Sequence, residues 1–285
     1  MLTRRKTLGL GLAACGFAPM PALAQAPPVI RFGLTPVFLD NDAQILDEFR
    51  RYLRDVTGAE VQFTQRRTYK EVVALLILGD IDVAWLCGYP LLQHANDIEA
   101  LAMPVWRGGT RYQSYLIVPQ DSAAARIEDL RGGIHAYSDP DSNSGYLVTV
   151  SELLHLGQKP ETFFSKSFFT FGHRNVTVAV ARRLADSGSV DGYVWEALVE
   201  EEPELAKGTR IIWRSEWFGF PPICVPRALA STPVIQRLRQ ALFAMQDHPT
   251  GQNVLRALHL DGFAPPAAGE FDSIARRMQL LSRRG

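Results

Sequence analysis

The sequence predicts an α/β protein built from two lobes. Short apolar runs, typical of buried strands, alternate with segments whose apolar residues recur every three to four positions, as on one face of a helix. Strands that alternate with helices in this way form parallel sheets. The alternation occurs twice over about 260 of the 285 residues, more than a typical single domain holds. A cleft between two lobes is the usual place for a ligand.

The first 24 residues have the pattern of a signal peptide. Basic residues at 4–6 precede an apolar run over 7–17, and small residues follow at 22–24, as at secretory cleavage sites. We therefore expect export to the periplasm and cleavage after Ala24. The arginine pair also fits a twin-arginine signal, and both export routes stay open. Cys15 ends a stretch like a lipobox, but the apolar run before it is short.

Composition excludes several classes of function. Thirty basic and thirty acidic residues cancel, so the basic footprint of a nucleic-acid-binding protein is missing. After the leader, no apolar run approaches the roughly 18 residues of a membrane span. Three states are open to Cys87 and Cys224: a disulfide between them, two free thiols, or a bond to a thiophilic ligand. Their spacing in the sequence does not decide among these. The six histidines lack zinc-type spacing with them, so we expect no metal site. We also expect no cofactor, and a monomer.

The first βα block begins close to the end of the leader. Apolar spacing, strand alternation and the glycine stops at 58 and 79 define its elements. In order, we expect a strand at 29–34, a helix at 40–58, a strand at 61–64, a helix at 69–78 and a strand at 81–86.

The second block repeats this pattern. We expect strands at 114–119, 134–137, 168–171 and 190–194, a helical turn at 127–130, and helices at 145–156 and 176–185. Two further strands, at 211–213 and 222–226, are expected to return toward the first lobe. Pro233 then opens a helical tail, because proline is favoured at the first helical position.

A turn rich in serine, asparagine and glycine precedes the predicted helix at 145–156. Amide groups at a helix start have no partner within the helix and carry partial positive charge, so they bind anions. Ser142 and Ser144 add hydroxyl donors, and Gly145 lets the main chain approach a ligand closely. The alternative is that Ser142 or Ser144 only caps the helix.

Seven short motifs follow one another along the chain: Phe32-Gly33-Leu34-Thr35-Pro36, Tyr69-x-x-Val72-Val73 with Gly79-Asp80-Ile81-Asp82-Val83-Ala84, Tyr115-Leu116-Ile117-Val118, Asp129-Leu130-Arg131-Gly132, Asp139-Pro140-x-Ser142-x-Ser144-Gly145-Tyr146, Gly172-His173 and Gly188-x-Val190-Asp191-Gly192. In this order the chain resembles the periplasmic substrate-binding proteins of phosphonate, phosphite and phosphate ABC transporters. The resemblance implies a type II periplasmic binding protein fold with a hinge of crossing strands. It implies a discontinuous first lobe, 25–113 plus 221–285, and a second lobe at 114–220.

The resemblance also implies an oxyanion site in the cleft. His173 would donate a charge-assisted hydrogen bond beside the turn. Glu196 would accept from a cation or a protonated oxyanion, unless it is a solvated carboxylate. The expected ligand-binding residues are Thr35, Pro36, Tyr69, Cys87, Gly88, Tyr89, Ser142, Asn143, Ser144, Gly145, His173 and Glu196.

Cys87 departs from the family pattern, which places small residues and a proline after this strand. The carboxyl end of a strand lies in the crevice where open α/β sheets bind ligands. Thiolates favour soft centres, and the resemblance extends to periplasmic arsenite sensors. Cys87 is therefore the candidate arsenite ligand of a rival hypothesis, unless it is a small buried hydrophobe.

The expected function is that of an exported solute-binding protein, which captures a phosphate-, phosphite- or phosphonate-like oxyanion and delivers it to a membrane ABC permease. The rival is an oxyanion sensor that signals to a histidine kinase. An enzyme is not expected. A hydrolase would need a triad such as Ser144, His173 and Asp191, and Ser144 lacks the Gly-x-Ser-x-Gly context.

Overall fold

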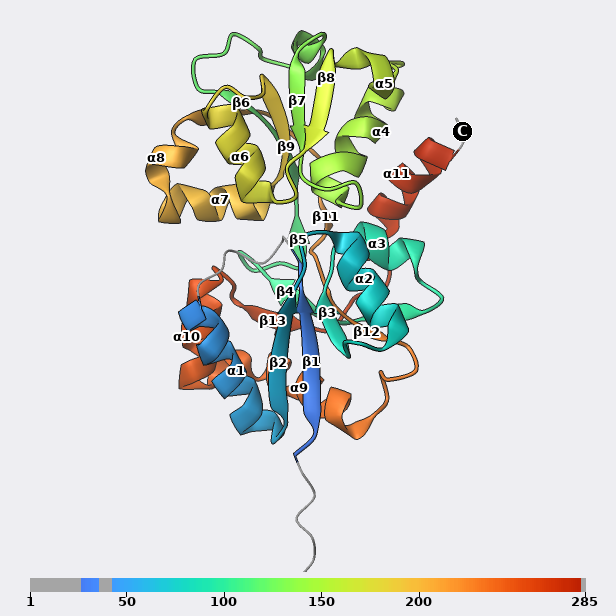
Figure 1. The fold of residues 1–285 in the computed structure, drawn as a ribbon, viewed down its shortest axis with the longest axis vertical. Helices are drawn as coiled ribbons and strands as arrows, with labels where there is room; N and C mark the ends of the chain where they lie inside the picture. Colours follow the sequence, from blue (N-terminus) through green and yellow to red (C-terminus); the bar gives the residue numbers. More distant parts are fainter. Residues whose placement is uncertain (1–26, 36–42, 283–285) are drawn as a thin grey trace, which may run out of the picture.

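The computed structural model describes residues 27–35 and 43–282. Two lobes, each an open sheet with helices on its faces, lie along the long axis of the molecule (Figure 1). The predicted signal peptide at 1–24 and Pro36 lie outside the described residues. No helix in the described ranges is long and apolar enough to span a bilayer.

The first lobe contains a mixed sheet in the order β13-β4-β12-β3-β1-β2. The bounds are β1 Val29–Leu34, β2 Glu60–Gln65, β3 Val83–Trp85, β4 Ile98–Val105, β12 Ile223–Pro226 and β13 Gly262–Ala264. β1 pairs in parallel with β2 and β3, whereas β12 is antiparallel to β3 and β4. The prediction of a sheet of parallel strands was therefore wrong for this lobe, because β12 enters from the second lobe and runs antiparallel to its neighbours.

Helices cover both faces of this sheet: α1 Ala43–Thr57, α2 Tyr69–Leu78, α3 Gly88–Gln93, α9 Pro233–Phe243, η3 Met245–Asp247 and α10 Pro249–Ala257. α2 has the bounds predicted from the sequence. Thr68 and Glu71 form a capping box at its start, and Gly79 ends it at a left-handed φ of 77°, a conformation that glycine adopts without steric cost. These end signals place Tyr69 at the top of the lobe, facing the other one.

The second sheet runs in the order β10-β6-β9-β7-β8. Its strands are β6 Ser114–Pro119, β7 Ile134–Tyr137, β8 Lys166–Phe169, β9 Ser187–Asp191 and β10 Thr209–Arg214. Its helices are η1 Ile127–Leu130, η2 Asn143–Leu147, α4 Val148–His155, α5 Pro160–Phe163, α6 His173–Ala181, α7 Gly192–Glu201 and α8 Pro203–Ala206.

Two strands of this sheet end before their predicted positions. The strand predicted at 190–194 stops at Asp191, whose side chain accepts a hydrogen bond from the amide of Tyr193 and so begins α7. The strand predicted at 168–171 is β8, which ends at Phe169. The apolar residues beyond Asp191 belong to a helix because the N-cap overrides their strand propensity.

Crossing segments join the lobes. Between the lobes, β5 (Arg111–Tyr112) pairs antiparallel with β11 (Phe218–Gly219), as Figure 1 shows. The C-terminal helix α11 (Asp272–Ser282) packs against α3 of the first lobe and α4 of the second. The lobe boundaries at 113/114 and 220/221 stay a prediction, and α11 is in contact with both lobes.

Candidate functional site

The predicted anion turn does not start a regular α-helix. Asn143–Leu147 forms a π-helical turn, and α4 begins only at Val148. The Oγ of Ser142 accepts a hydrogen bond of 3.0 Å from the amide of Gly145, so the capping role considered for Ser142 is present. The helix predicted from residue 145 therefore begins two residues earlier, in a wider turn of a kind that is frequent at functional sites.

Gly145 presses this turn against the end of β7. A Cβ at residue 145 would lie 1.7 Å from the Oγ of Ser138, and the amide of Ser138 donates to the carbonyl of Gly145 at 3.2 Å. Only glycine fits at this distance. The close approach brings Ser138, which is fully buried, into the wall of the site.

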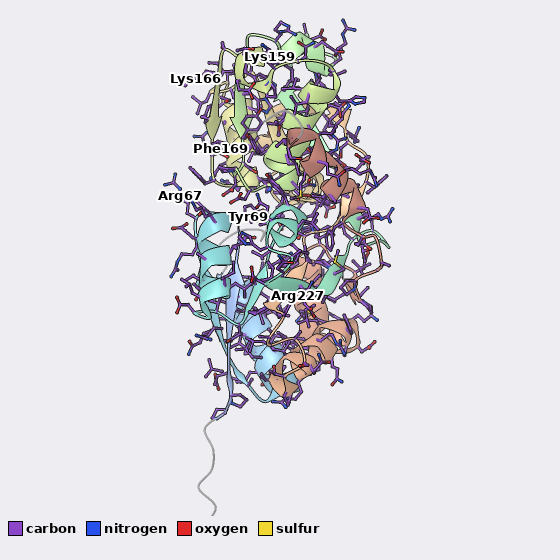
Figure 2. The ribbon with its side chains drawn as sticks, turned by 90° about the vertical axis from the view of Figure 1, so that its right-hand side faces the viewer. Arg67, Tyr69, Lys159, Lys166, Phe169 and Arg227 are labelled. Carbon is purple, nitrogen blue, oxygen red and sulfur yellow. The ribbon has the colours of Figure 1, made fainter. Side chains whose placement is uncertain are left out.

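The first lobe contributes Cys87 and Tyr69. The Sγ of Cys87 accepts a hydrogen bond of 3.2 Å from the amide of Asn143, and burial raises the pKa of the thiol to about 11. The amide of Tyr69 donates to the Oδ2 of Asp139 at 3.3 Å. Figure 2 shows Tyr69 at the end of the first lobe that faces the second. These two hydrogen bonds join the lobes in a closed arrangement around a protonated thiol.

Tyr112, in the hinge strand β5, contacts the same turn. Its Oη accepts a hydrogen bond of 3.0 Å from the Nδ2 of Asn143. Its ring is buried, and burial followed by the charges of Cys87 and Asp191 raises the pKa of its hydroxyl well above the usual value. Sequence reasoning missed Tyr112 because β5 has only two residues and carries no periodicity.

His173 and Asp191 form a buried pair beside the turn. The amide of Asp191 donates to the Nδ1 of His173 at 3.0 Å, so the neutral ring carries its proton on Nε2. Burial lowers the pKa of His173 to about 3. The ring is therefore neutral, and the hydrogen bond from His173 to an anion stays a prediction, in which the anion supplies the charge.

The Asp191 carboxyl is the most perturbed acid of the site. Burial raises its pKa to about 7, although amides of Tyr193 and Val194 and the nearby hydroxyl of Ser144 lower it. Near neutral pH the group therefore exists in both protonation states. An acid poised in this way donates or accepts a proton according to what is bound beside it.

Four side-chain oxygens of this region, among the described residues, are buried without a hydrogen-bond partner: Tyr69 Oη, Ser138 Oγ, Asn143 Oδ1 and Asp191 Oδ2. Each such group costs about 1 to 3 kcal/mol unless something satisfies it. Asn143 is hydrogen-bonded to both Cys87 and Tyr112, and the amide of Tyr69 is hydrogen-bonded to Asp139, so these residues of the two lobes lie in contact. Two hydroxyl donors and two oxygen acceptors suit a small oxyanion that still carries a proton.

Three other predicted ligand residues have structural partners. The Oγ1 of Thr35 donates to the carbonyl of Trp85 at 2.8 Å. A Cβ on Gly88 would lie 2.6 Å from the Cδ1 of Ile274, so this glycine admits α11. Tyr89 is half-buried and hydrogen-bonded to Gln93, and its pKa is raised by burial and then by the charge of Asp141. Gly88 therefore acts in packing.

Glu196 is not brought together with the turn. Its carboxylate accepts from Arg107 at 3.2 Å and from the Oη of Tyr115 at 3.1 Å. It lines a separate surface pocket with Trp106 and Trp217. Its partner Arg107 lies in the link between β4 and β5, so the pair joins the lobes at their edge.

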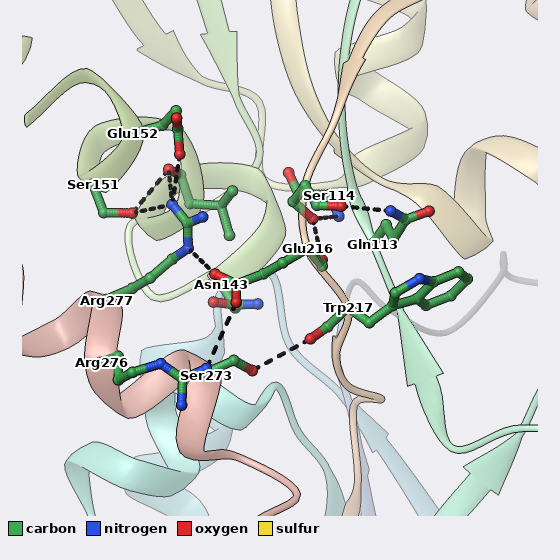
Figure 3. A network of polar contacts seen from close by, with 12 residues as sticks. Gln113, Ser114, Asn143, Ser151, Glu152, Glu216, Trp217, Ser273, Arg276 and Arg277 are labelled. Atoms are coloured by element: carbon green, nitrogen blue, oxygen red, sulfur yellow. Dashed lines mark hydrogen bonds and ion pairs between the residues drawn. The ribbon is translucent and has the colours of Figure 1, made fainter. Parts of the chain in front are cut away.

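Arg277 of α11 supports the turn from behind. Its Nη1 donates to the Oγ of Ser151 at 3.0 Å and to Glu152 at 3.1 Å, while its Nε donates to Glu216 at 3.0 Å. Figure 3 shows this network between α11, α4 and the hinge segment. The side chain is only 12% exposed, and α4 continues directly from the turn, so Arg277 positions the turn indirectly.

The geometry of a hydrolytic triad is missing. The Nδ1 of His173 accepts from a backbone amide, whereas a triad histidine donates from this atom to the carboxylate. Cys87 and Cys224 are both free, so the disulfide alternative was wrong. Within the described ranges no group of three or more His, Cys, Asp or Glu side chains could hold a metal ion.

Comparisons with known proteins agree with this architecture. The phosphate-import protein PhnD of Mycolicibacterium smegmatis is 24% identical over 232 residues, which cover 75% of this chain and 72% of the relative. The phosphonates-binding periplasmic protein of Escherichia coli is 22% identical over 213 residues, which cover 71% of this chain and 62% of the relative.

Solved structures of low identity show the same fold. A binding protein component of an ABC phosphonate transporter from Pseudomonas aeruginosa superposes with a TM-score of 0.81 at 22% identity, covering 90% of this chain and 88% of the other. PhnD1 from Prochlorococcus marinus, solved in complex with methylphosphonate, has a TM-score of 0.77 at 18% identity, covering 90% and 99%. The predicted two-lobed type II periplasmic binding protein fold is confirmed.

The family comparison covers most of the chain. Residues 32–271 match the family described as "ABC transporter, phosphonate, periplasmic substrate-binding protein". This range includes the π-helical turn and Tyr69, Cys87, Tyr112, Ser138, His173 and Asp191, while Arg277 of α11 lies beyond it. The chain therefore belongs to the periplasmic substrate-binding proteins of phosphonate ABC transporters.

Proposed function

We propose that this protein captures a small phosphorus oxyanion between its lobes in the periplasm and delivers it to a membrane ABC permease, without performing chemistry on it. The four buried oxygens without partners carry this proposal. Tyr69 belongs to the first lobe and the other three residues to the second, so one ligand would satisfy both sides. The names of the relatives, a phosphate-import and a phosphonates-binding protein, support the ligand class.

Closure of the lobes is the proposed mechanism. Contacts that a ligand makes with both lobes stabilise the closed state relative to the open one. The Tyr69 and Ser138 hydroxyls and the Nε2 of His173 would donate to the anion oxygens. Asp191 would share one proton with the ligand, which suits an oxyanion that keeps a hydroxyl.

The sensor hypothesis is not favoured. Arsenite is bound by thiolates, and burial raises the pKa of Cys87 to about 11. Cys224 lies in β12, fully buried, with the carbonyl of Pro222 as its contact. The matched relatives are named for import or binding of phosphorus compounds, which supports a transport role.

Titration of the reduced protein with methylphosphonate by calorimetry tests this proposal, with Tyr69→Phe as the central variant. Among the residues that the structure describes, the Oη of Tyr69 has no hydrogen-bond partner, so we expect its removal to leave the stability of the free protein unchanged or higher. A lost hydrogen bond to a charged ligand costs about 1.5 to 3 kcal/mol. We therefore expect affinity to fall between about 10-fold and 150-fold.

Tyr52→Phe is the matched control. The Oη of Tyr52 is also buried, but it donates to the carbonyl of Ala241, away from the cleft. This variant should lose stability and keep its affinity. Unchanged affinity in Tyr69→Phe, or no binding of phosphorus oxyanions by the unchanged protein, would contradict the proposed function.

A further inference from the structure

Cys87 places a weak hydrogen-bonding group, a thiol, beside the π-helical turn. It follows β3 directly and is 2% exposed. Its Sγ lies 3.2 Å from the amide of Asn143, the first residue of the π-helical turn. Because burial keeps the thiol protonated, the sulfur is a weak donor and a weak acceptor.

The opposite groups of the site are strong hydrogen-bonding partners. Tyr69 Oη, Asn143 Oδ1 and Asp191 Oδ2 are buried and have no hydrogen-bond partner within residues 27–35 and 43–282. Asn143, whose amide donates to the sulfur, also carries the unpartnered Oδ1, so the thiol lies beside one of these oxygens. One side of the site thus suits polar corners of a ligand, and the sulfur side does not.

The amide of Asn143 increases this asymmetry. In the predicted cradle it would donate to an anion oxygen, but here it donates to sulfur. An oxygen placed against Cys87 would therefore have to displace the sulfur or remain poorly paired. A buried charged oxygen without a good partner costs about 1 to 3 kcal/mol or more, whereas an apolar substituent against sulfur gains dispersion.

We propose that Cys87 is a specificity-determining residue, which makes the cleft prefer a phosphorus oxyanion with one hydrogen or methyl substituent over inorganic phosphate. The inference rests on the proposed function and names the substrate class of that same site. The tetrahedral ligand would direct three oxygens to the polar groups and its apolar corner to the sulfur. A preference of about 10-fold to 100-fold for methylphosphonate is expected from one poorly paired oxygen.

Calorimetric titrations with methylphosphonate and inorganic phosphate, on the reduced protein and on Cys87→Ser, test the proposal. A serine hydroxyl still accepts from the Asn143 amide and donates strongly to a fourth oxygen. We expect phosphate to bind more tightly and the preference for methylphosphonate to fall at least about tenfold. Cys87→Thr carries the same hydroxyl and serves if the serine protein does not fold, as judged by its urea unfolding curve.

Two further variants separate the thiol from general effects of substitution. Cys224→Ser changes the other buried thiol, which lies in β12, and should leave the preference unchanged. Cys87→Ala removes sulfur without adding a donor and should keep the preference for methylphosphonate.

The outcomes distinguish the inference from the function beneath it. An unchanged preference in a folded Cys87→Ser or Cys87→Thr protein, with methylphosphonate still bound, would overturn the role of Cys87 and leave the proposed function standing. Tighter binding of phosphate than of methylphosphonate by the unchanged protein would also overturn the role of Cys87 and leave the proposed function standing. Failure of the unchanged protein to bind either anion would overturn both.

Discussion

The amide of Asn143 donates a hydrogen bond of 3.2 Å to the Sγ of Cys87 across the boundary between the lobes. The two residues are 56 positions apart in the chain, and they follow strands of different sheets, β3 and β7. One contact therefore joins the two walls of the site at a buried thiol.

Ligand binding should protect Cys87 from alkylation. The thiol is 2% exposed in the closed arrangement and Cys224 is fully buried in the first-lobe core. Opening of the lobes separates Cys87 from Asn143 but leaves Cys224 in its sheet. We expect iodoacetamide to label Cys87 alone, and saturating methylphosphonate to slow the labelling at least about tenfold, because closed and open populations shift with the ligand. Peptide mass spectrometry over time gives both rates; equal labelling of the two cysteines would contradict this.

Asp191→Asn should change how stability depends on pH. Its folded pKa of about 7 lies above the unfolded value of about 3.9. The folded state therefore binds this proton more tightly, and the free energy of unfolding falls as pH rises from about 4 to 7, by up to about 4 kcal/mol. The side-chain oxygen of the asparagine still accepts from the amide of Tyr193. Because asparagine does not titrate, the variant does not lose this stability as pH rises.

Urea unfolding of both proteins between pH 4 and 8 measures the effect. The buried histidines His135 and His173, whose pKa values burial lowers to about 3, destabilise both proteins as pH falls below about 6.5. Their contribution cancels in the difference. The asparagine variant should gain stability relative to the unchanged protein as pH rises, and a difference that stays constant with pH would argue against the raised pKa.

Gly145→Ala should destabilise the turn. The added Cβ would lie 1.7 Å from the Oγ of Ser138 and 3.0 Å from that of Ser142. Overpacking of this kind costs about 1 to 3 kcal/mol, and movement of Ser138 should weaken methylphosphonate binding as well. Gly109→Ala is the matched control, because nothing lies within 4 Å of its added Cβ. Equal stability of the two variants in urea would refute the close-approach argument.

Arg277→Gln should lower stability more than Arg276→Gln. The neighbours lie on the same helix, but the Arg277 side chain is 12% exposed and Arg276 is 65% exposed. Loss of Arg277 removes a charge-assisted hydrogen bond from the partly buried Glu152, at about 1.5 to 3 kcal/mol, whereas an exposed pair contributes under about 1 kcal/mol. Urea unfolding and the dissociation rate of methylphosphonate should both change in Arg277→Gln, and similar behaviour of the two variants would show that α11 does not support the turn.

Part of the fold was predictable because its signals are local. β1, α2, β6 and β7 have the bounds expected from the sequence. β4 was missed, since Ala, Met and Pro104 give it little strand propensity and it forms through pairing with β12 and β13. β12 was expected as a strand, but its antiparallel place in the sheet depends on the return of the chain from the second lobe.

The sequence by itself determined the leader pattern, the α/β repeats and the polar turn at 142–145, because composition and periodicity report local propensity and burial. Only the tertiary structure decided which chemistry meets in the cleft. It joined Cys87 to Asn143, made His173 neutral, raised the pKa of Asp191 to about 7 and bound Glu196 to Arg107. These properties arise from burial and from contacts between residues far apart in the chain. The spacing of residues along the sequence does not reveal burial or such contacts.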